Sequence, residues 1–81
     1  MKPTHTPTTR LTHSFRKGEL RIKTDANWQL CIKTADALCD NGYEVTEIRR
    51  TDGRVWNIIT VECLKKDILN IVEFCKTALK L

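Results

Sequence analysis

Four cysteines are the residues of this 81-residue chain that could bind a metal ion or form disulfides. None of them forms the C-x-x-C pair that structural zinc sites usually contain. Cys31 and Cys39 lie on one expected helix, about 12 Å apart along its axis, which is too far for a disulfide or a shared metal ion. With Cys75 they occupy apolar helix positions, where a free cysteine behaves as a small buried hydrophobic residue. We therefore expect no metal site and no cofactor, and Cys63, at a strand end, is the thiol to test for reactivity.

Side chains suited to catalysis are equally sparse. His5 lies in a segment without an apolar pattern, so no rigid neighbour can orient it. His13 could act as a base toward Ser14, but adjacent residues on a strand point to opposite faces, and no carboxylate completes the arrangement. The three glycines are isolated turn residues and form no phosphate-binding loop. The sequence therefore predicts a protein that is not an enzyme and has no small-molecule substrate.

Basic residues near the N-terminal end are the strongest functional signal. The net charge is +4, yet residues 1–23 contain six Lys or Arg against one Glu, whereas residues 24–81 contain eight against nine acidic residues. Basic segments of this kind often contact nucleic acid or another anionic surface. The alternative is a solvated tail that serves solubility alone. Because residues 1–9 contain two Pro and four Thr without an apolar pattern, we expect a flexible basic arm there, followed by a single domain over residues 10–81.

Alternating apolar and polar residues predict the strands that would position these side chains. The first two strands are expected to be joined by a turn at residues 16–18, where Gly18 can take a positive φ. The last two flank Asp52-Gly53, and an Asp-Gly pair between two such runs is a strong hairpin signal. The expected strands span residues 11–15, 19–23, 44–50 and 54–63.

Two segments repeat apolar residues at the spacing of an amphipathic helix. The first runs from Trp28 to Cys39, with Thr24 or Asp25 as its expected N-cap and Asn41-Gly42 as its end. The second runs over residues 68–79. The sequence therefore predicts an α+β two-layer sandwich, in which an antiparallel sheet of three or four strands carries two helices packed on one face. Its order is ββαββα, or βαββα if residues 11–15 form no strand.

The second hairpin determines which residues the helices leave uncovered. A two-residue turn at Asp52-Gly53 places Thr51 opposite Arg54 and Arg49 opposite Trp56, and opposed residues share a face of the sheet. We assign one face to the core (Ile48, Val55, Ile59 and Val61, with Thr46 and Asn57 fitting it poorly) and the other to the surface (Val45, Glu47, Arg49, Trp56, Ile58 and Thr60). A register slip of one residue would instead bury Trp56 in the core.

A tryptophan beside arginines can stack on bases while the arginines pair with phosphates, or it can anchor a protein interface. Our first hypothesis is therefore a small binding or regulatory module that contacts nucleic acid. The alternative is a protein-interaction module (a regulator, an inhibitor or a homodimer) that uses the open sheet face around Trp56. No apolar run approaches the ~18 residues of a membrane span, and four thiols favour a reducing, cytoplasmic location. The candidate binding residues are Arg10, Arg16, Lys17, Arg21, Lys23, Arg49, Arg50, Arg54 and Trp56.

Overall fold

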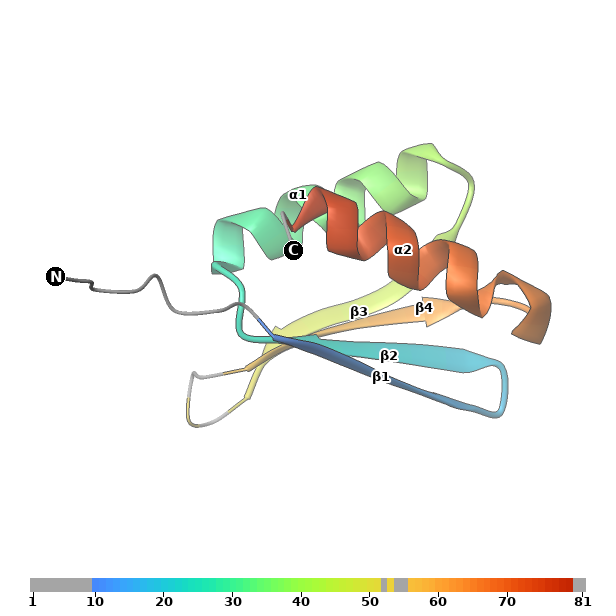
Figure 1. Cartoon of the computed structure of the whole chain (residues 1–81), viewed down its shortest axis with the longest axis horizontal. Helices are drawn as coiled ribbons and strands as arrows, with labels where there is room; N and C mark the ends of the chain where they lie inside the picture. The colour runs from blue at the N-terminus through green and yellow to red at the C-terminus, as the bar shows by residue number, and fades with distance from the viewer. Residues whose placement is uncertain (1–9, 52, 54–55, 80–81) are drawn as a thin grey trace, which may run out of the picture.

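The computed structural model describes residues 10–51, 53 and 56–79, and it forms a layer of four strands under a layer of two helices (Figure 1). The order is ββαββα, which confirms the expected fold class and the strand at the start of the domain. The arm expected over residues 1–9 lies outside the described residues, as do Asp52, Arg54 and Val55 of the second hairpin. The elements are β1 (Leu11–Arg16), β2 (Glu19–Thr24), α1 (Trp28–Asp40), β3 (Glu44–Arg50), β4 (Asn57–Glu62), the 3-10 turn η1 (Lys65–Asp67) and α2 (Ile68–Ala78).

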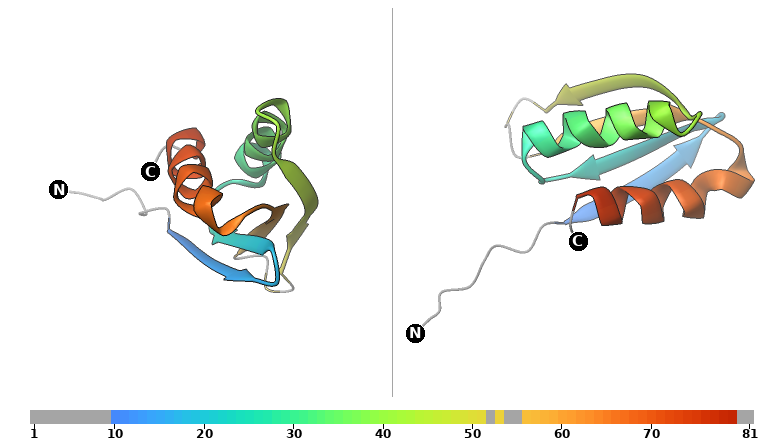
Figure 2. Two further views of the ribbon diagram at one scale, coloured as in Figure 1. Left: turned by 90° about the vertical axis from the view of Figure 1, so that its right-hand side faces the viewer. Right: turned by 90° about the horizontal axis from the view of Figure 1, so that it is seen from above.

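The four strands form one antiparallel sheet in the order β1-β2-β4-β3. Both helices lie on the same side of this sheet, as the end-on view in Figure 2 shows. Helix α1 contacts β3 and β4, and α2 contacts β1. Among the described residues no element covers the opposite side of the sheet, and we call it the uncovered face.

The core lies between the sheet and the helices. Alternate residues of β2 and β4 point into it and are fully buried, because their branched side chains pack beneath the apolar stripes of the helices. The helices contribute buried residues at the expected spacing. The buried apolar residues are Leu20, Ile22, Ala26, Cys31, Ala35, Leu38, Ile59, Val61, Ile71, Val72, Cys75 and Leu79.

The register of the second hairpin differs from the expected one by two residues. Arg49 pairs with Ile58 and not with Trp56, and the Thr51 amide donates to the Trp56 carbonyl at 2.9 Å, so the prediction that Thr51 opposes Arg54 is wrong. The connection is two residues longer than a two-residue turn. Because side chains alternate with a period of two, this shift leaves Arg49 and Trp56 on one face of the sheet.

A β-bulge in β3 changes the face of one predicted residue. Val45 pairs with Val61 and Glu47 pairs with Thr60, so Thr46 is the extra residue of the bulge. Val45 therefore packs against the core, and its predicted place on the uncovered face is wrong. The bulge also explains why Thr46 fits the core pattern poorly, since its side chain is exposed.

Helix α1 begins at Trp28, four residues after Thr24, and uses a different cap from the expected one. The Asn27 side chain accepts a hydrogen bond from the Gln29 amide at 2.7 Å, so the prediction of Thr24 or Asp25 as N-cap is wrong. Thr24 is instead the last residue of β2, and its hydroxyl donates to the Arg10 carbonyl at 2.7 Å. Thr24 and Asp25 both bond to Arg10 and so join the start of β1 to the end of β2. The helix therefore begins further along the chain than expected.

Candidate nucleic-acid interface

The uncovered face is formed by alternate residues of the four strands, arranged in rows by the strand register. Pairing within the strands forms three such rows, and backbone hydrogen bonds from Asp25 to Arg10 and from Thr51 to Trp56 extend the face by a fourth. From one end of the sheet to the other, the rows are Arg10, Asp25, Trp56 and Thr51; Thr12, Lys23, Ile58 and Arg49; Ser14, Arg21, Thr60 and Glu47; and Arg16, Glu19, Glu62 and Glu44.

Trp56 lies at one end of this face with two cations against its ring. The Arg10 guanidinium lies 4.8 Å from the ring centroid and the Lys23 ammonium 5.2 Å from it. The tryptophan is partly exposed, so it is not the core residue that the alternative register required. Arg49 follows in the next row, on the far side of Ile58 from Lys23. We call Arg10, Lys23, Arg49 and Trp56 the Trp56 cluster.

The Arg10 side chain is held in this cluster by Asp25. The Arg10 backbone amide donates to Asp25 Oδ1 at 2.7 Å, and Arg10 Nε donates to Asp25 Oδ2 at 3.1 Å. These interactions hold the pKa of Asp25 below its ordinary value, with the hydrogen bond from the Arg10 backbone amide as the largest cause. The paired carboxylate therefore orients the guanidinium beside the ring and leaves its other donors to solvent.

The remaining cations of this face are loosely held. Arg49 lies 3.7 Å from a carboxylate oxygen of Glu47, but both side chains are more than half exposed, so this contact contributes little. Arg21 stands in the middle of the sheet, between Ser14 and Thr60. Both arginines are thus free to turn toward a ligand at small cost.

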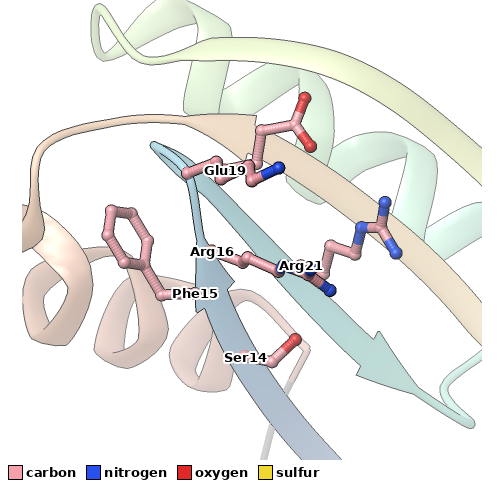
Figure 3. A pocket seen from close by; sticks show the side chains of 6 residues that line it. Ser14, Phe15, Arg16, Glu19 and Arg21 are labelled. Atoms are coloured by element: carbon pink, nitrogen blue, oxygen red, sulfur yellow. The ribbon is translucent and has the colours of Figure 1, made fainter.

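The other predicted site residues do not join the cluster. Arg16 and Lys17 lie at the opposite end of the sheet, and Arg16 is about 20 Å from Arg10 along β1. They line a hollow of about 500 Å³ with Ser14, Glu19 and Arg21 (Figure 3). Arg50 faces the helices, where its guanidinium stacks 4.9 Å from the ring centroid of Trp28. Arg54 lies outside the described residues.

Two features of the uncovered face were missed by the sequence reasoning. The last row places Glu62 directly opposite both Glu19 and Glu44, so three glutamates occupy neighbouring positions across three strands. In the centre, the Thr60 side chain is 97% buried between its neighbours Arg21 and Glu47, and its hydroxyl has no hydrogen-bond partner among the described residues. Neither feature could be found without the β2–β4 pairing, which the sequence pattern does not specify.

The cysteines are free thiols with little tendency to ionise in the core. Burial raises the pKa of Cys75 to about 12 and also raises the pKa of Cys31. Burial, and to a smaller extent the charge of Asp67, raises the pKa of Cys63. Cys39 is exposed, so its predicted burial is wrong: it follows the fully buried Leu38 by one position, about 100° further around the helix, and so lies away from the buried face of α1.

Within residues 10–51, 53 and 56–79, no three His, Cys, Asp or Glu side chains are grouped so that they could hold a metal ion. No helix in this part of the chain is long and apolar enough to cross a bilayer. Comparisons with protein-family models, with curated proteins and with solved structures found no match.

Proposed function

We propose that this protein binds nucleic acid on the uncovered face of its sheet, at the Trp56 cluster. The observation that supports this most directly is a partly exposed tryptophan ring with two cations within about 5 Å of its centroid and a third in the next row. A ring of this kind can stack on a base of any sequence, and the cations can pair with the adjoining phosphates.

The energies of these contacts favour replacement of Lys23 by a base at the Trp56 ring. An exposed cation–π contact contributes about 0.5–1 kcal/mol, whereas a base stacked on an aromatic side chain contributes about 1–3 kcal/mol. A base can therefore displace Lys23 from the ring, and the released ammonium can then bind a phosphate. Arg10 keeps its position because Asp25 holds it, so the site does not have to be assembled when the ligand arrives.

The alternative sequence hypothesis, a protein interface on the same face, agrees less well with its composition. The interior of a protein interface is typically poor in Lys, Glu and Asp and rich in apolar contact area. The uncovered face instead carries charged residues in every row, and Trp56 and Ile58 are its two large apolar side chains. In the half of the face around Trp56 three cations stand against one carboxylate, and this excess of positive charge beside an aromatic ring suits a polyanion better than an apolar partner.

Adjacent arginines on opposite faces provide the test. Arg49→Ala removes a cation from the uncovered face, whereas Arg50→Ala removes the same side chain from the helix side. Fluorescence anisotropy with labelled DNA and RNA oligonucleotides should show weaker binding for Arg49→Ala by roughly three- to tenfold, with a salt slope smaller by about 0.7 to 0.9. Arg50→Ala should bind as the wild type does.

Trp56→Leu extends the test to the stacking residue, because leucine keeps apolar bulk but has no aromatic face. We expect a loss of affinity of roughly tenfold with the native circular dichroism spectrum retained. Absence of binding to any DNA or RNA at low salt would refute the proposal. Equal losses for Arg49→Ala and Arg50→Ala would show that the site lies elsewhere on the molecule.

A further inference from the structure

We infer that the ligand is a single strand and that it occupies only about three or four nucleotides, following β2 from Trp56 and ending before the row of three carboxylates. This inference rests on the proposed function and adds to it the kind of nucleic acid and the length of the site. It is drawn from the arrangement of charge along the face, from the hollow beside β2 and from the buried hydroxyl of Thr60.

A single strand is favoured because the ring and the cations lie together. Arg10 and Lys23 contact the Trp56 ring itself, so a ligand must present the flat side of a base and its phosphates at the same place. In a duplex the flat sides of the bases are stacked on one another and only the backbone and the groove edges are accessible. A single strand exposes both and can splay a base onto the ring.

The cations of β2 define the path of the strand. Lys23 and Arg21 are two positions apart on the same face of β2, which corresponds to about 6.6 Å along this β-strand. Successive phosphates of an extended nucleic-acid single strand have a comparable separation. A hollow of about 270 Å³ lies at this part of the sheet and is lined by Lys23 and Arg21 together with Thr12, His13 and Ser14 of β1 and Ile58 of β4. Phosphates can therefore follow β2 while the sugars and bases occupy the hollow.

Thr60 provides a separate indication of a ligand at the centre of the face. Its buried hydroxyl has no partner among the described residues and lies next to Arg21 in the register. Such groups are costly and are usually paired. When Arg21 turns toward a phosphate, the hydroxyl beneath it becomes accessible and can donate to an oxygen of the same phosphate.

The carboxylates determine where the site ends. The half of the face around Trp56 contains Arg10, Lys23 and Arg49 against Asp25, whereas the last row contains one arginine against three glutamates. Directly opposed like charges destabilise a sheet, and these would also repel a phosphate. The distance from Asp25 to Arg21 is about 13 Å along β2, which leaves room for three or four nucleotides.

A length series of labelled single strands, from two to twelve nucleotides of oligothymidylate and of oligouridylate, measures the site. Affinity should rise steeply up to about four nucleotides. For longer strands it should rise only in proportion to the number of positions at which the strand can occupy the site. In the Glu44→Gln/Glu62→Gln variant the steep rise should continue to longer strands. The Asp36→Asn/Asp40→Asn variant changes the net charge equally on the exposed side of α1 and should keep the wild-type length dependence.

The outcomes separate this inference from the proposed function. Equal affinity for a duplex and a single strand, or a steep rise through twelve nucleotides in the wild type, would overturn the inference while leaving nucleic-acid binding in place. No binding to any strand would refute the proposed function itself. Thr60→Val should weaken single-strand binding by roughly three- to tenfold, and unchanged affinity of that variant would show that the hydroxyl takes no part.

Discussion

Replacing Thr60 by valine should make the protein more stable, although the side chain is buried in the middle of the sheet. Threonine and valine have nearly the same shape, so the substitution exchanges a hydroxyl for a methyl group and leaves the packing in place. The Thr60 side chain is 97% buried and its hydroxyl has no hydrogen-bond partner among the described residues. The native state therefore carries a desolvated polar group that valine removes.

The magnitude follows from the cost of such a group. An unpaired buried hydroxyl destabilises a protein by about 1–3 kcal/mol, and the added methyl group gains a little from burial. We expect Thr60→Val to raise the free energy of unfolding by about 1–2 kcal/mol. For a domain of this size that corresponds to a rise in Tm of about 4–16 °C, at about 4–8 °C per kcal/mol.

Two other buried threonines serve as matched controls. The Thr24 hydroxyl donates to the Arg10 carbonyl at 2.7 Å and accepts from the Ala26 amide at 3.2 Å, so Thr24→Val removes two hydrogen bonds, takes away the partner of the Ala26 amide and should destabilise by about 1–3 kcal/mol. The Thr34 hydroxyl donates to the Leu30 carbonyl one helical turn earlier, at 2.7 Å. Because this hydrogen bond joins two residues that the backbone hydrogen bonds of α1 already connect, Thr34→Val should change stability by less than about 1 kcal/mol.

Urea denaturation followed by circular dichroism gives the three free energies under one set of conditions. The expected order of stability is Thr60→Val above wild type, then Thr34→Val close to wild type, then Thr24→Val. A loss of stability for Thr60→Val as large as that of Thr24→Val would show that the Thr60 hydroxyl is hydrogen-bonded in solution. The reasoning about the centre of the uncovered face would then be wrong.

Three further predictions concern a turn, the thiols and the carboxylate beside Trp56. Lys17 has a φ of +52° in the β1–β2 turn, a conformation that asparagine adopts more readily than lysine. Lys17→Asn should therefore raise the free energy of unfolding by about 0.5–1 kcal/mol in urea titrations, and an unchanged free energy would contradict the assigned turn. Iodoacetamide labelling with peptide mapping should modify exposed Cys39 in the native protein and Cys75 only after unfolding; equal rates would mean that the core opens. Arg10 lowers the pKa of Asp25, so the stability that this carboxylate contributes should be present above its ordinary pKa and be lost as the pH falls through the lower native pKa. Urea titrations over this pH range should show that Asp25→Asn abolishes this part of the decrease in the free energy of unfolding.

The alternation of apolar residues was sufficient to predict the fold class from the sequence. All four expected strands and both helices are present, and the last strand is Asn57–Glu62 within the expected range 54–63, because each pattern reports which side chains must leave water. The face assigned to Trp56 was also correct, even though the predicted register was displaced by two residues. The assignment survived because an error of two residues preserves the alternation, whereas an error of one would have reversed it.

The errors in the sequence reasoning have local physical causes. The bulge at Thr46 moves Val45 to the core side, and a bulge leaves no periodic signal in a seven-residue strand. Asn27 replaces Thr24 as the cap of α1 because the Thr24 side chain is already hydrogen-bonded to the first strand. Both errors arise from contacts between segments that are distant in the sequence, which a local pattern does not contain.

The arrangement of the candidate site depends on residues that face the other way. Asn57 follows Trp56 in the chain but points into the core, where its side-chain amide donates to the Ala26 carbonyl at 2.8 Å. Thr24 joins the same connection to the carbonyl of Arg10. These two buried side chains fix β4 and the start of β1 to the segment after β2, directly beneath the ring and its two cations. The Trp56 cluster is therefore positioned by polar contacts within the core, and its four members, which come from four different segments of the chain, form no motif in the sequence.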